Sequence, residues 1–571
     1  MADPIISFKN FSFQYRAQKQ PTLHDINLDI YPGERVLIAG PSGSGKSTLA
    51  SCINGLIPFS YPGQCTGTLT VDGVDAPHSS IFQLSQHVGT VLQDPDGQFI
   101  GLTVGEDIAF SLENDCVAQP EMKDTVKKVA GLVGVDGLLD LAPHELSGGQ
   151  KQRVGLAGVM VDRVQILLFD EPLANLDPAT GKSTMELIDE IQEKTQTTVV
   201  IIEHRLEDVL WRHVDRIILV NEGRILADTT PDQLLSGSLL RDNGIREPLY
   251  LTALKYAGVE ITPEKHPDHL DRLVLDEGDI RKVQDWFTAV GQPPEKPERP
   301  VLLEGKHLNF GYTPDRQILH DVNFVIHEGE MVSIVGHNGT GKSTLAKLIC
   351  GFETPDSGQL LLEGKDITQD SIRSRAAQIG YVMQNPNQMI SKTMIFEEVA
   401  LGLSRSGLSQ EEIRTRVEET LKICGLYPFR NWPISALSFG QKKRVTIASV
   451  LVMGPKLILL DEPTAGQDYR HYTEIMEFLR QLNRRGVTVV MITHDMHLML
   501  EYTPRALAFS GGRLIADTTA AQVLCDPELT QRAALKETSL FGLAQKCGID
   551  RPLEFVDRFI GYEESQREVK E

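Results

Sequence analysis

The sequence predicts an α/β protein in which one nucleotide-binding unit is present twice, in tandem. Residues 40–48 fit the phosphate-binding pattern G-x-x-x-x-G-K-[ST], and residues 336–344 fit it again. Residues 35–39 before the first pattern form an apolar run typical of a buried strand, and a helix is expected from Leu49 onward. This strand–loop–helix order is the context that a P-loop requires, and its recurrence argues against a chance match.

The composition limits what the chain can be. Its 571 residues, of which 41% are hydrophobic, suffice for several domains with large cores. We find no signal peptide in the first residues and no apolar run of the roughly 18 residues expected of a transmembrane helix. The net charge of −22 argues against non-specific binding to nucleic acid or anionic lipid. Seven scattered cysteines without a C-x-x-C pair indicate free thiols in a reducing cytosol.

The two P-loops predict two ATP sites. Glycines let backbone N–H groups close around phosphate oxygens, and the following helix N-terminus adds partial positive charge. Lys46 and Lys342 are predicted to reach the β- and γ-phosphates, and Ser47 and Ser343 to ligate Mg²⁺. The predicted phosphate cradles comprise Gly40, Pro41, Ser42, Gly43, Ser44, Gly45, Lys46, Ser47 and Thr48, and Gly336, His337, Asn338, Gly339, Thr340, Gly341, Lys342, Ser343 and Thr344.

The spacing between equivalent residues locates one insertion. Lys46 and Lys342 lie 296 residues apart, whereas Gln93 and Gln384 lie 291 apart. Five extra residues therefore fall within residues 57–66 of the first copy, a segment rich in Pro, Gly and polar residues that we expect to be a surface loop.

An aromatic residue ends the first strand-like segment of each copy. Tyr15 closes residues 5–15, and Tyr312 closes residues 301–312. Either ring could stack on a purine base, which is our prediction. An ordinary core or surface aromatic is the alternative.

A glutamine follows a predicted strand in each copy. Gln93 and Gln384 are expected to reach Mg²⁺ or the attacking water, although a solvated loop glutamine is the alternative. The turns that follow, residues 94–99 and 385–389, end in Phe99 and Met389. We expect these turns to line a groove for a partner protein, unless the apolar residues fold into the core.

A second predicted anion site is a serine before a basic helix. Serine at a helix N-cap, with free N–H groups behind it, can bind an anion, although a plain helix cap is the alternative. Its repetition at the same offset favours the anion site. The predicted ATP-contacting residues here are Ser147, Gly148, Gly149 and Gln150, and Ser438, Gly440 and Gln441.

Paired carboxylates end a buried apolar strand in each copy. Such groups are costly to hold there without a cation. Asp170 and Asp461 are expected to serve Mg²⁺, and Glu171 and Glu462 to act as general bases toward the attacking water. Two further predictions concern the turns and strand ends that follow. Asp177 and Asp468 contribute to the ATP sites, and His204 and His494, each after a strand, sense the γ-phosphate; a lone structural histidine is the alternative.

The repeat continues beyond the nucleotide machinery. Residues 246–260 align with residues 536–550 at an offset of 290, which predicts a small helical subdomain after each core. The predicted domains are ATPase domain 1 (1–235), helical subdomain 1 (236–264), a connector (265–300) that ends in an extended Pro-rich spacer, ATPase domain 2 (301–525) and helical subdomain 2 (526–571).

The order of these motifs resembles the ATP-binding-cassette (ABC) ATPases over nearly the whole chain, twice. The resemblance implies two tandem ABC nucleotide-binding domains, each with a RecA-like P-loop core, an antiparallel β part and a helical part. It also implies an intramolecular head-to-tail dimer. One ATP site would combine Lys46 with Ser438 and Gly440, and the other would combine Lys342 with Ser147, Gly148 and Gly149.

Within that family, residues 93–110 resemble the energy-coupling-factor (ECF) importers of vitamins or metal ions. This resemblance implies a peripheral position on the cytoplasmic face of the membrane, a transmembrane coupling subunit and a small substrate-binding membrane protein. The fused, duplicated form is most similar to ATPases assigned to thiamine or its hydroxymethylpyrimidine precursor.

Three other functions stay open. A tandem-cassette translation factor usually has a basic linker, whereas residues 239–300 carry nine Lys or Arg against twelve Asp or Glu. A tandem sugar-importer ATPase often lacks one catalytic glutamate, whereas Glu171 and Glu462 are both present. An exporter ATPase uses the same motifs.

The second copy departs from the first at two places. Phe439 replaces the first glycine of the second signature, and residues 466–468 differ from residues 175–177. No catalytic group is lost, so we expect two competent sites.

Overall fold

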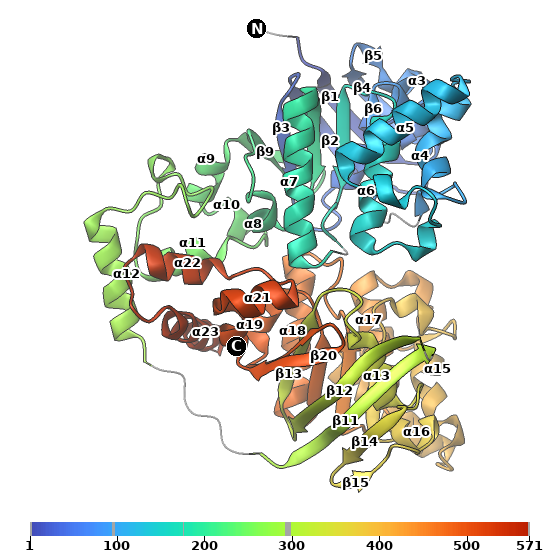
Figure 1. Cartoon of the computed structure of the whole chain (residues 1–571), viewed down its shortest axis with the longest axis vertical. Coiled ribbons are helices and arrows are strands. Elements are labelled where there is room, and N and C mark those ends of the chain that lie inside the picture. Colours follow the sequence, from blue (N-terminus) through green and yellow to red (C-terminus); the bar gives the residue numbers. More distant parts are fainter. Residues whose placement is uncertain (1–2, 94–96, 175, 292–298, 314, 569–571) are drawn as a thin grey trace. The chain divides into compact units, whose positions relative to one another are not determined.

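The computed structural model describes residues 3–93, 97–174, 176–291, 299–313 and 315–568. They form two compact units, one over Met1–Trp286 with Asp468–Arg470 and the other over Phe287–Gln467 with His471–Glu571. Each unit contains one copy of the repeat, the first drawn in blue to green and the second in yellow to red (Figure 1). The predicted pair of α/β units is therefore confirmed.

A six-stranded sheet carries the P-loop in each unit. The strand order is β10-β9-β3-β8-β7-β6 in the first copy and β20-β19-β13-β18-β17-β16 in the second, so every strand has the same neighbours in both. All pairs are parallel except those of β9 with β10 and of β19 with β20. The strands are β3 (Arg35–Ala39), β6 (Val88–Val91), β7 (Ile166–Asp170), β8 (Thr198–Ile202), β9 (Arg216–Asn221), β10 (Arg224–Thr229), β13 (Met331–Gly336), β16 (Ile379–Val382), β17 (Leu457–Asp461), β18 (Thr488–Ile492), β19 (Arg505–Ser510) and β20 (Arg513–Thr518).

The central strands are apolar throughout because both faces of a parallel sheet are covered. Every residue of β3 and of β8 is buried. Parallel pairing brings the carboxyl ends of β7 and β8 to one edge, with Asp170 opposite Ile202. In the second copy Asp461 lies opposite Ile492. The acidic pairs and the residues after β8 and β18 thus meet at the same edge of each sheet.

A four-stranded antiparallel sheet accompanies each core. The orders are β2-β1-β4-β5 and β12-β11-β14-β15. The strands are β1 (Ile6–Tyr15), β2 (Leu23–Ile30), β4 (Gly63–Val71), β5 (Val74–Asp75), β11 (Val301–Thr313), β12 (Arg316–His327), β14 (Ser357–Leu362) and β15 (Lys365–Asp366). The surface-loop prediction for residues 57–66 is wrong for much of that segment. Helix α2 (Leu56–Phe59) and the start of β4 occupy it, because β1 is long enough for Tyr15 to pair with Gly63.

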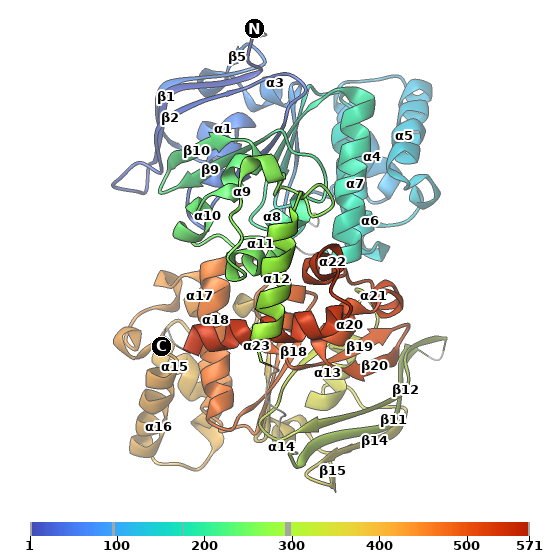
Figure 2. The same cartoon turned by 90° about the vertical axis from the view of Figure 1, so that its left-hand side faces the viewer.

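Helices complete each unit. In the first, α4, α5 and α6 pack together beside α7, and α15, α16 and α17 form the matching helical part of the second (Figure 2). Their bounds, with those of the other core helices, are α1 (Lys46–Ile53), α3 (Ile81–Ser85), α4 (Val104–Asn114), α5 (Gln119–Val133), α6 (Gly148–Met160), α7 (Pro178–Thr195), α8 (Leu206–Val209), α13 (Lys342–Cys350), α14 (Ile372–Ala376), α15 (Ile395–Ala400), α16 (Gln410–Ile423), α17 (Phe439–Leu451), α18 (Tyr469–Arg484) and α19 (Met496–Tyr502).

Short helices follow each core, as the repeat predicts. Helix α11 (Leu249–Tyr256) and helix α22 (Ser539–Lys546) begin and end 290 residues apart. The described part of the segment predicted as a connector includes a helix that the sequence did not predict, α12 (Glu277–Ala289). Residues 292–298 of the Pro-rich spacer lie outside the described residues. The remaining helices are α9 (Pro231–Ser236), α10 (Leu239–Asp242), α20 (Ala520–Cys525), α21 (Pro527–Ala533) and α23 (Pro552–Glu568).

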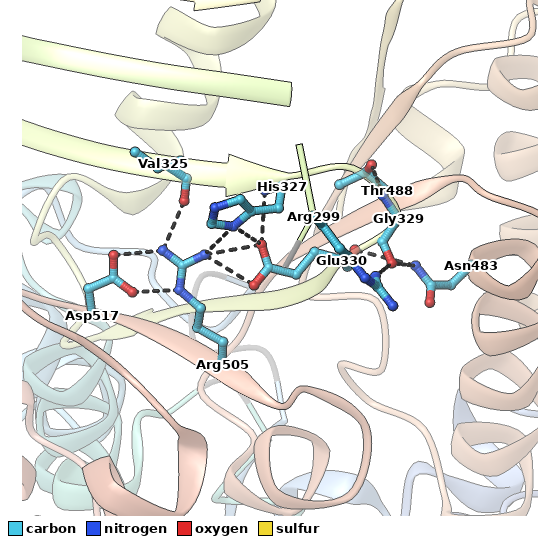
Figure 3. A network of polar contacts seen from close by, with 9 residues as sticks. All are labelled: Arg299, Val325, His327, Gly329, Glu330, Asn483, Thr488, Arg505 and Asp517. Carbon is cyan, nitrogen blue, oxygen red and sulfur yellow. Dashed lines mark hydrogen bonds and ion pairs between the residues drawn. The ribbon is translucent and has the colours of Figure 1, made fainter. Parts of the chain in front are cut away.

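A partly buried arginine joins the two sheets of each copy. Arg505 on β19 donates to both carboxylate oxygens of Glu330 at 3.1 Å and to Asp517 on β20 at 2.6 and 2.7 Å (Figure 3). It also donates to the Val325 carbonyl of β12 at 3.0 Å. Arg216 makes the same pattern in the first copy with Glu34 and Asp228, so this network belongs to the scaffold.

Within the described ranges, none of the helices is both long enough and apolar enough to cross a membrane.

Candidate nucleotide sites

Each P-loop wraps its lysine. Lys46 Nζ donates to the carbonyl oxygens of Gly40 and Pro41 at 2.8 and 2.9 Å. Lys342 Nζ donates to those of Gly336 and His337 at 2.6 and 2.9 Å. Burial lowers the pKa of Lys46, and the Glu171 carboxylate opposes that shift. The lysines are thus held inside the loops at the helix N-termini, where the phosphate group of a nucleotide is predicted.

The first glycine of each loop cannot be replaced by a larger residue. Gly40 has φ 159° and Gly336 has φ 145°. A Cβ at Gly40 would lie 2.1 Å from the Val220 carbonyl oxygen, and one at Gly336 would lie 2.3 Å from that of Phe509. The close approach of loop and strand therefore requires glycine there.

Asp170 and Asp461 end β7 and β17, as predicted. Burial raises the pKa of both carboxyl groups. Asp170 Oδ1 is buried without a hydrogen-bond partner. Asp461 accepts hydrogen bonds from Tyr381, at 3.1 Å, and from Ser343. The predicted Mg²⁺ ligands Ser343 and Asp461 therefore lie together.

Glu171 and Glu462 have a strained backbone that the sequence did not reveal. Their φ angles are 49° and 45°, in the left-handed region that costs a non-glycine residue energy. The N–H of each donates to the strand alongside, at 2.9 Å to the carbonyl of Ile202 or Ile492. Burial, with a contribution from Glu203, raises the pKa of Glu171 to about 7. Strain of this kind at both copies is typical of a functional position.

Gln93 and the two predicted histidines lie near the glutamates, but differently in the two copies. Gln93 Nε2 donates to Glu171 Oε2 at 2.6 Å. His204 Nδ1 lies 3.9 Å from Glu171 Oε1. In the second copy His494 Nδ1 lies 2.7 Å from Glu462 Oε1, within hydrogen-bond distance. Burial lowers the pKa of His204.

The predicted N-caps have the expected geometry. Ser147 accepts from the Gln150 N–H at 3.4 Å, and Gln150 Oε1 accepts from the Ser147 N–H at 2.8 Å. Ser438 and Gln441 repeat this capping box at 3.3 and 3.0 Å. Each serine thus begins a helix, α6 or α17, whose first turn carries no acidic residue.

The remaining predicted residues lie on elements that flank the P-loops. The Tyr15 hydroxyl is 3.0 Å from Thr48 Oγ1, and the Tyr15 ring packs edge-on against Phe13. Tyr312 is 48% exposed and accepts a hydrogen bond from Lys347 at 3.2 Å. Asp177 caps α7 by accepting from the Thr180 N–H at 3.0 Å. Asp468 is buried immediately before α18.

Two buried charged residues beside the glutamates were missed. Glu203, 0% exposed, precedes His204, and Lys443, 1% exposed, donates to the backbone carbonyls of Gln384 and Glu462 at 3.0 and 2.9 Å. Burial lowers the pKa of Lys443 to about 8. Comparing the copies residue by residue would have found them, because Thr493 and Gln152 occupy the equivalent positions.

The turns expected to receive a partner are only partly described, since residues 94–96 lie outside the described residues. Phe99 and Met389 are half-buried, and Met389 Sδ accepts from the Met383 N–H at 3.2 Å. Nearby in the first copy, Ile100 and Leu102 are 64% and 82% exposed. The most exposed apolar side chains there are therefore one and three residues beyond the predicted anchor.

Residues 23–174 and 319–465 match the ABC transporter family model. The two matches span both P-loops and both acidic pairs. The chain belongs to the ABC transporter family. It is a duplicated ATP-binding-cassette ATPase, as the motifs predict. Residues 237–310 match a model described as an ATP-binding cassette cobalt transporter, in agreement with the resemblance to ECF ATPases. A model described as an AAA domain matches residues 430–501, within the second cassette.

Relatives match this ABC ATPase over almost its whole length and theirs. It is 58% identical over 563 residues to a "Putative ABC transporter ATP-binding protein" of Clostridium perfringens, with 99% of each chain covered. A protein of the same name from Enterococcus faecalis is 59% identical over 577 residues, with 100% of each covered. Among solved structures, cbiO1 of Clostridium perfringens, described as part of the ABC transporter complex cbiONQ, is 35% identical. That match covers 41% of this chain and 94% of the other, with a TM-score of 0.38.

Proposed function

We propose that this ABC ATPase is the energy-coupling subunit of an ECF-type importer for a vitamin-like small molecule or a metal ion. One observation supports ATP hydrolysis by both copies. Each copy contains an enclosed P-loop lysine, a strained glutamate after a buried strand and a histidine near that glutamate. A degenerate tandem ATPase would have lost one of these groups from one copy.

In each proposed site the P-loop binds the phosphates, with Lys46 or Lys342 neutralising the γ-phosphoryl charge. Glu171 and Glu462 accept a proton from the attacking water, and Gln93 and His204, with Gln384 and His494, orient the water and the γ-phosphate. A proton acceptor must lie within hydrogen-bond reach of the group it deprotonates. The position of both glutamates at the carboxyl edge of the sheet, beside the loop, supports this role.

Magnesium is proposed at both sites. Ser47, Gln93 and Asp170 would hold it in the first copy, and Ser343, Gln384 and Asp461 in the second. The buried Asp170 Oδ1 without a partner and the contact of Ser343 with Asp461 fit a small cation. No group of three or more His, Cys, Asp or Glu side chains arranged for a metal occurs in the described part of the chain. Mg²⁺ suits such a site because it commonly binds one or two carboxylates plus phosphates, and it would neutralise phosphate charge.

The proposed partners are a transmembrane coupling subunit and a small substrate-binding membrane protein, with the ATPase held peripherally at the cytoplasmic face of the membrane. Exposed Ile100 and Leu102, which lie between Gln93 and α4 in the sequence, supply apolar anchors for such a partner. Movement near Gln93 could therefore be transmitted from the nucleotide to the partner.

Two substrate classes remain in the proposal. The resemblance favours the hydroxymethylpyrimidine precursor of thiamine, whereas the description of the model that matches residues 237–310 names cobalt. Uptake of each labelled compound should be measured in cells that express the chain with its neighbouring membrane proteins. ATP-dependent accumulation of one compound, lost with Glu171→Gln plus Glu462→Gln, supports the importer. Outward transport, or no complex with any membrane protein, would refute it.

A further inference from the structure

The first cassette holds a buried carboxylate that the second lacks. Glu203 follows β8 and is 0% exposed. Its Oε1 accepts from the backbone N–H groups of His204 and Arg205 at 2.9 and 3.3 Å, and its Oε2 accepts from that of Leu173 at 3.3 Å. In the second cassette the same position is Thr493, which carries no charge.

This carboxylate changes the surroundings of the histidine. His204 Nδ1 lies 3.2 Å from Glu203 Oε1 but 3.9 Å from Glu171 Oε1. In the second cassette His494 Nδ1 is 2.7 Å from Glu462 itself. The nearest carboxylate to the histidine is therefore Glu203 in one copy and the proposed general base in the other.

The glutamates are correspondingly held by different groups. Glu171 accepts from the Gln93 amide at 2.6 Å. Glu462 pairs with His494, and its backbone carbonyl accepts from the buried ammonium group of Lys443 at 2.9 Å. At the residue equivalent to Lys443 the first cassette has uncharged Gln152, which donates to the Pro172 carbonyl. A buried anion thus adjoins one site, and a buried cation adjoins the other.

We propose that Glu203 is a positioning residue that holds His204 away from Glu171, so that the two ATP sites use different arrangements of the glutamate–histidine pair. The inference rests on the proposed function, in which these residues act at the γ-phosphate. A carboxylate beside one ring nitrogen fixes the orientation and the tautomer of an imidazole. Glu203 therefore holds the Nδ1 edge of the His204 ring and leaves the opposite edge for the γ-phosphoryl group.

The competing explanation is that Glu203 only staples the turn after β8 through its three backbone hydrogen bonds. That role predicts altered folding or ATP affinity when the side chain changes. A positioning role predicts a slower chemical step in the first cassette alone. The two explanations are separated by measuring hydrolysis and binding one site at a time.

The test uses the full chain and single-turnover hydrolysis of bound ATP. Glu462→Gln leaves the first cassette to be measured, and Glu171→Gln leaves the second. In the Glu462→Gln background, Glu203→Gln should slow the remaining hydrolysis about tenfold, within the range for aiding proton transfer and orientation, and leave the Kd for ATP within about twofold. In the Glu171→Gln background Glu203→Gln should change nothing.

Asp279→Asn is the matched control. Asp279, in α12, is also a buried carboxylate of the first unit, but it pairs with Lys265 instead of a residue of the ATP site. It should leave both rates unchanged. Equal slowing in both backgrounds, a changed ATP affinity, or an unchanged first-cassette rate would overturn the inference. Because the glutamine keeps the shape and the acceptor oxygen of Glu203, the variant tests the charge without removing the turn. If the background substitutions themselves leave hydrolysis at the wild-type rate, the proposed function fails instead.

Discussion

Replacing either proposed general base should strongly slow hydrolysis at its own site while sparing ATP binding. Glu171→Gln and Glu462→Gln keep side-chain length and an acceptor oxygen. Gln93, which donates to Glu171 at 2.6 Å, therefore retains a partner. The positive φ at both positions is unchanged, because the new residue has the same backbone requirements. We expect at most about 1 kcal/mol of lost hydrogen bonding in the folded protein.

The expected loss in rate is much larger. A positioned general base contributes roughly 10²–10⁴-fold, or about 3–5 kcal/mol of activation free energy. The assay is phosphate release per bound ATP in single turnover, with ATP affinity measured separately by equilibrium binding. Each single variant should hydrolyse one of its two bound ATP molecules at close to the normal rate. A variant that loses ATP affinity, or that hydrolyses both at the wild-type rate, would refute the assignment of these carboxylates.

Three other outcomes follow from the structure. Ile100→Ser with Leu102→Ser should abolish co-purification with the membrane partner while basal ATPase activity persists; an intact complex would contradict the docking assignment. Lys443→Met should lower the thermal unfolding temperature, because two backbone carbonyls lose a charge-assisted donor at a cost of about 2–4 kcal/mol. An unchanged temperature would mean that water replaces the lysine ammonium group as their donor. Burial raises the pKa of Cys350 to about 12, so at pH 8 this thiol should stay unlabelled by a maleimide while exposed Cys116 reacts; rapid labelling of Cys350 would count against the fold.

The sequence alone was enough for much of the architecture because the relevant signals are local. A mostly apolar run of five residues predicts a buried strand, and β3 has the predicted bounds. Serine three residues before glutamine predicts the capping boxes at Ser147 and Ser438. The equivalence of α11 and α22 follows from the repeat.

Other features depend on contacts between distant segments. The left-handed backbone of Glu171 arises where the end of β7 meets β8, and no neighbouring residue type announces it. Glu203 and Lys443 become informative only once the fold brings them to the acidic pair. Phe99 is half-buried rather than exposed, and the neighbouring Gln98 donates to the Thr90 carbonyl at 3.1 Å.

The central claim is that the two P-loops power ATP hydrolysis, and the turnover of the Lys46→Ala, Lys342→Ala double variant tests it most directly. Both ammonium groups lie enclosed in their loops, against the Gly40 and Gly336 carbonyls. Removing them should eliminate charge stabilisation of the transferring phosphoryl group. The account predicts that the purified wild-type chain hydrolyses Mg-ATP without nucleic acid and that the folded double variant does not. Undiminished turnover by the double variant would contradict the account.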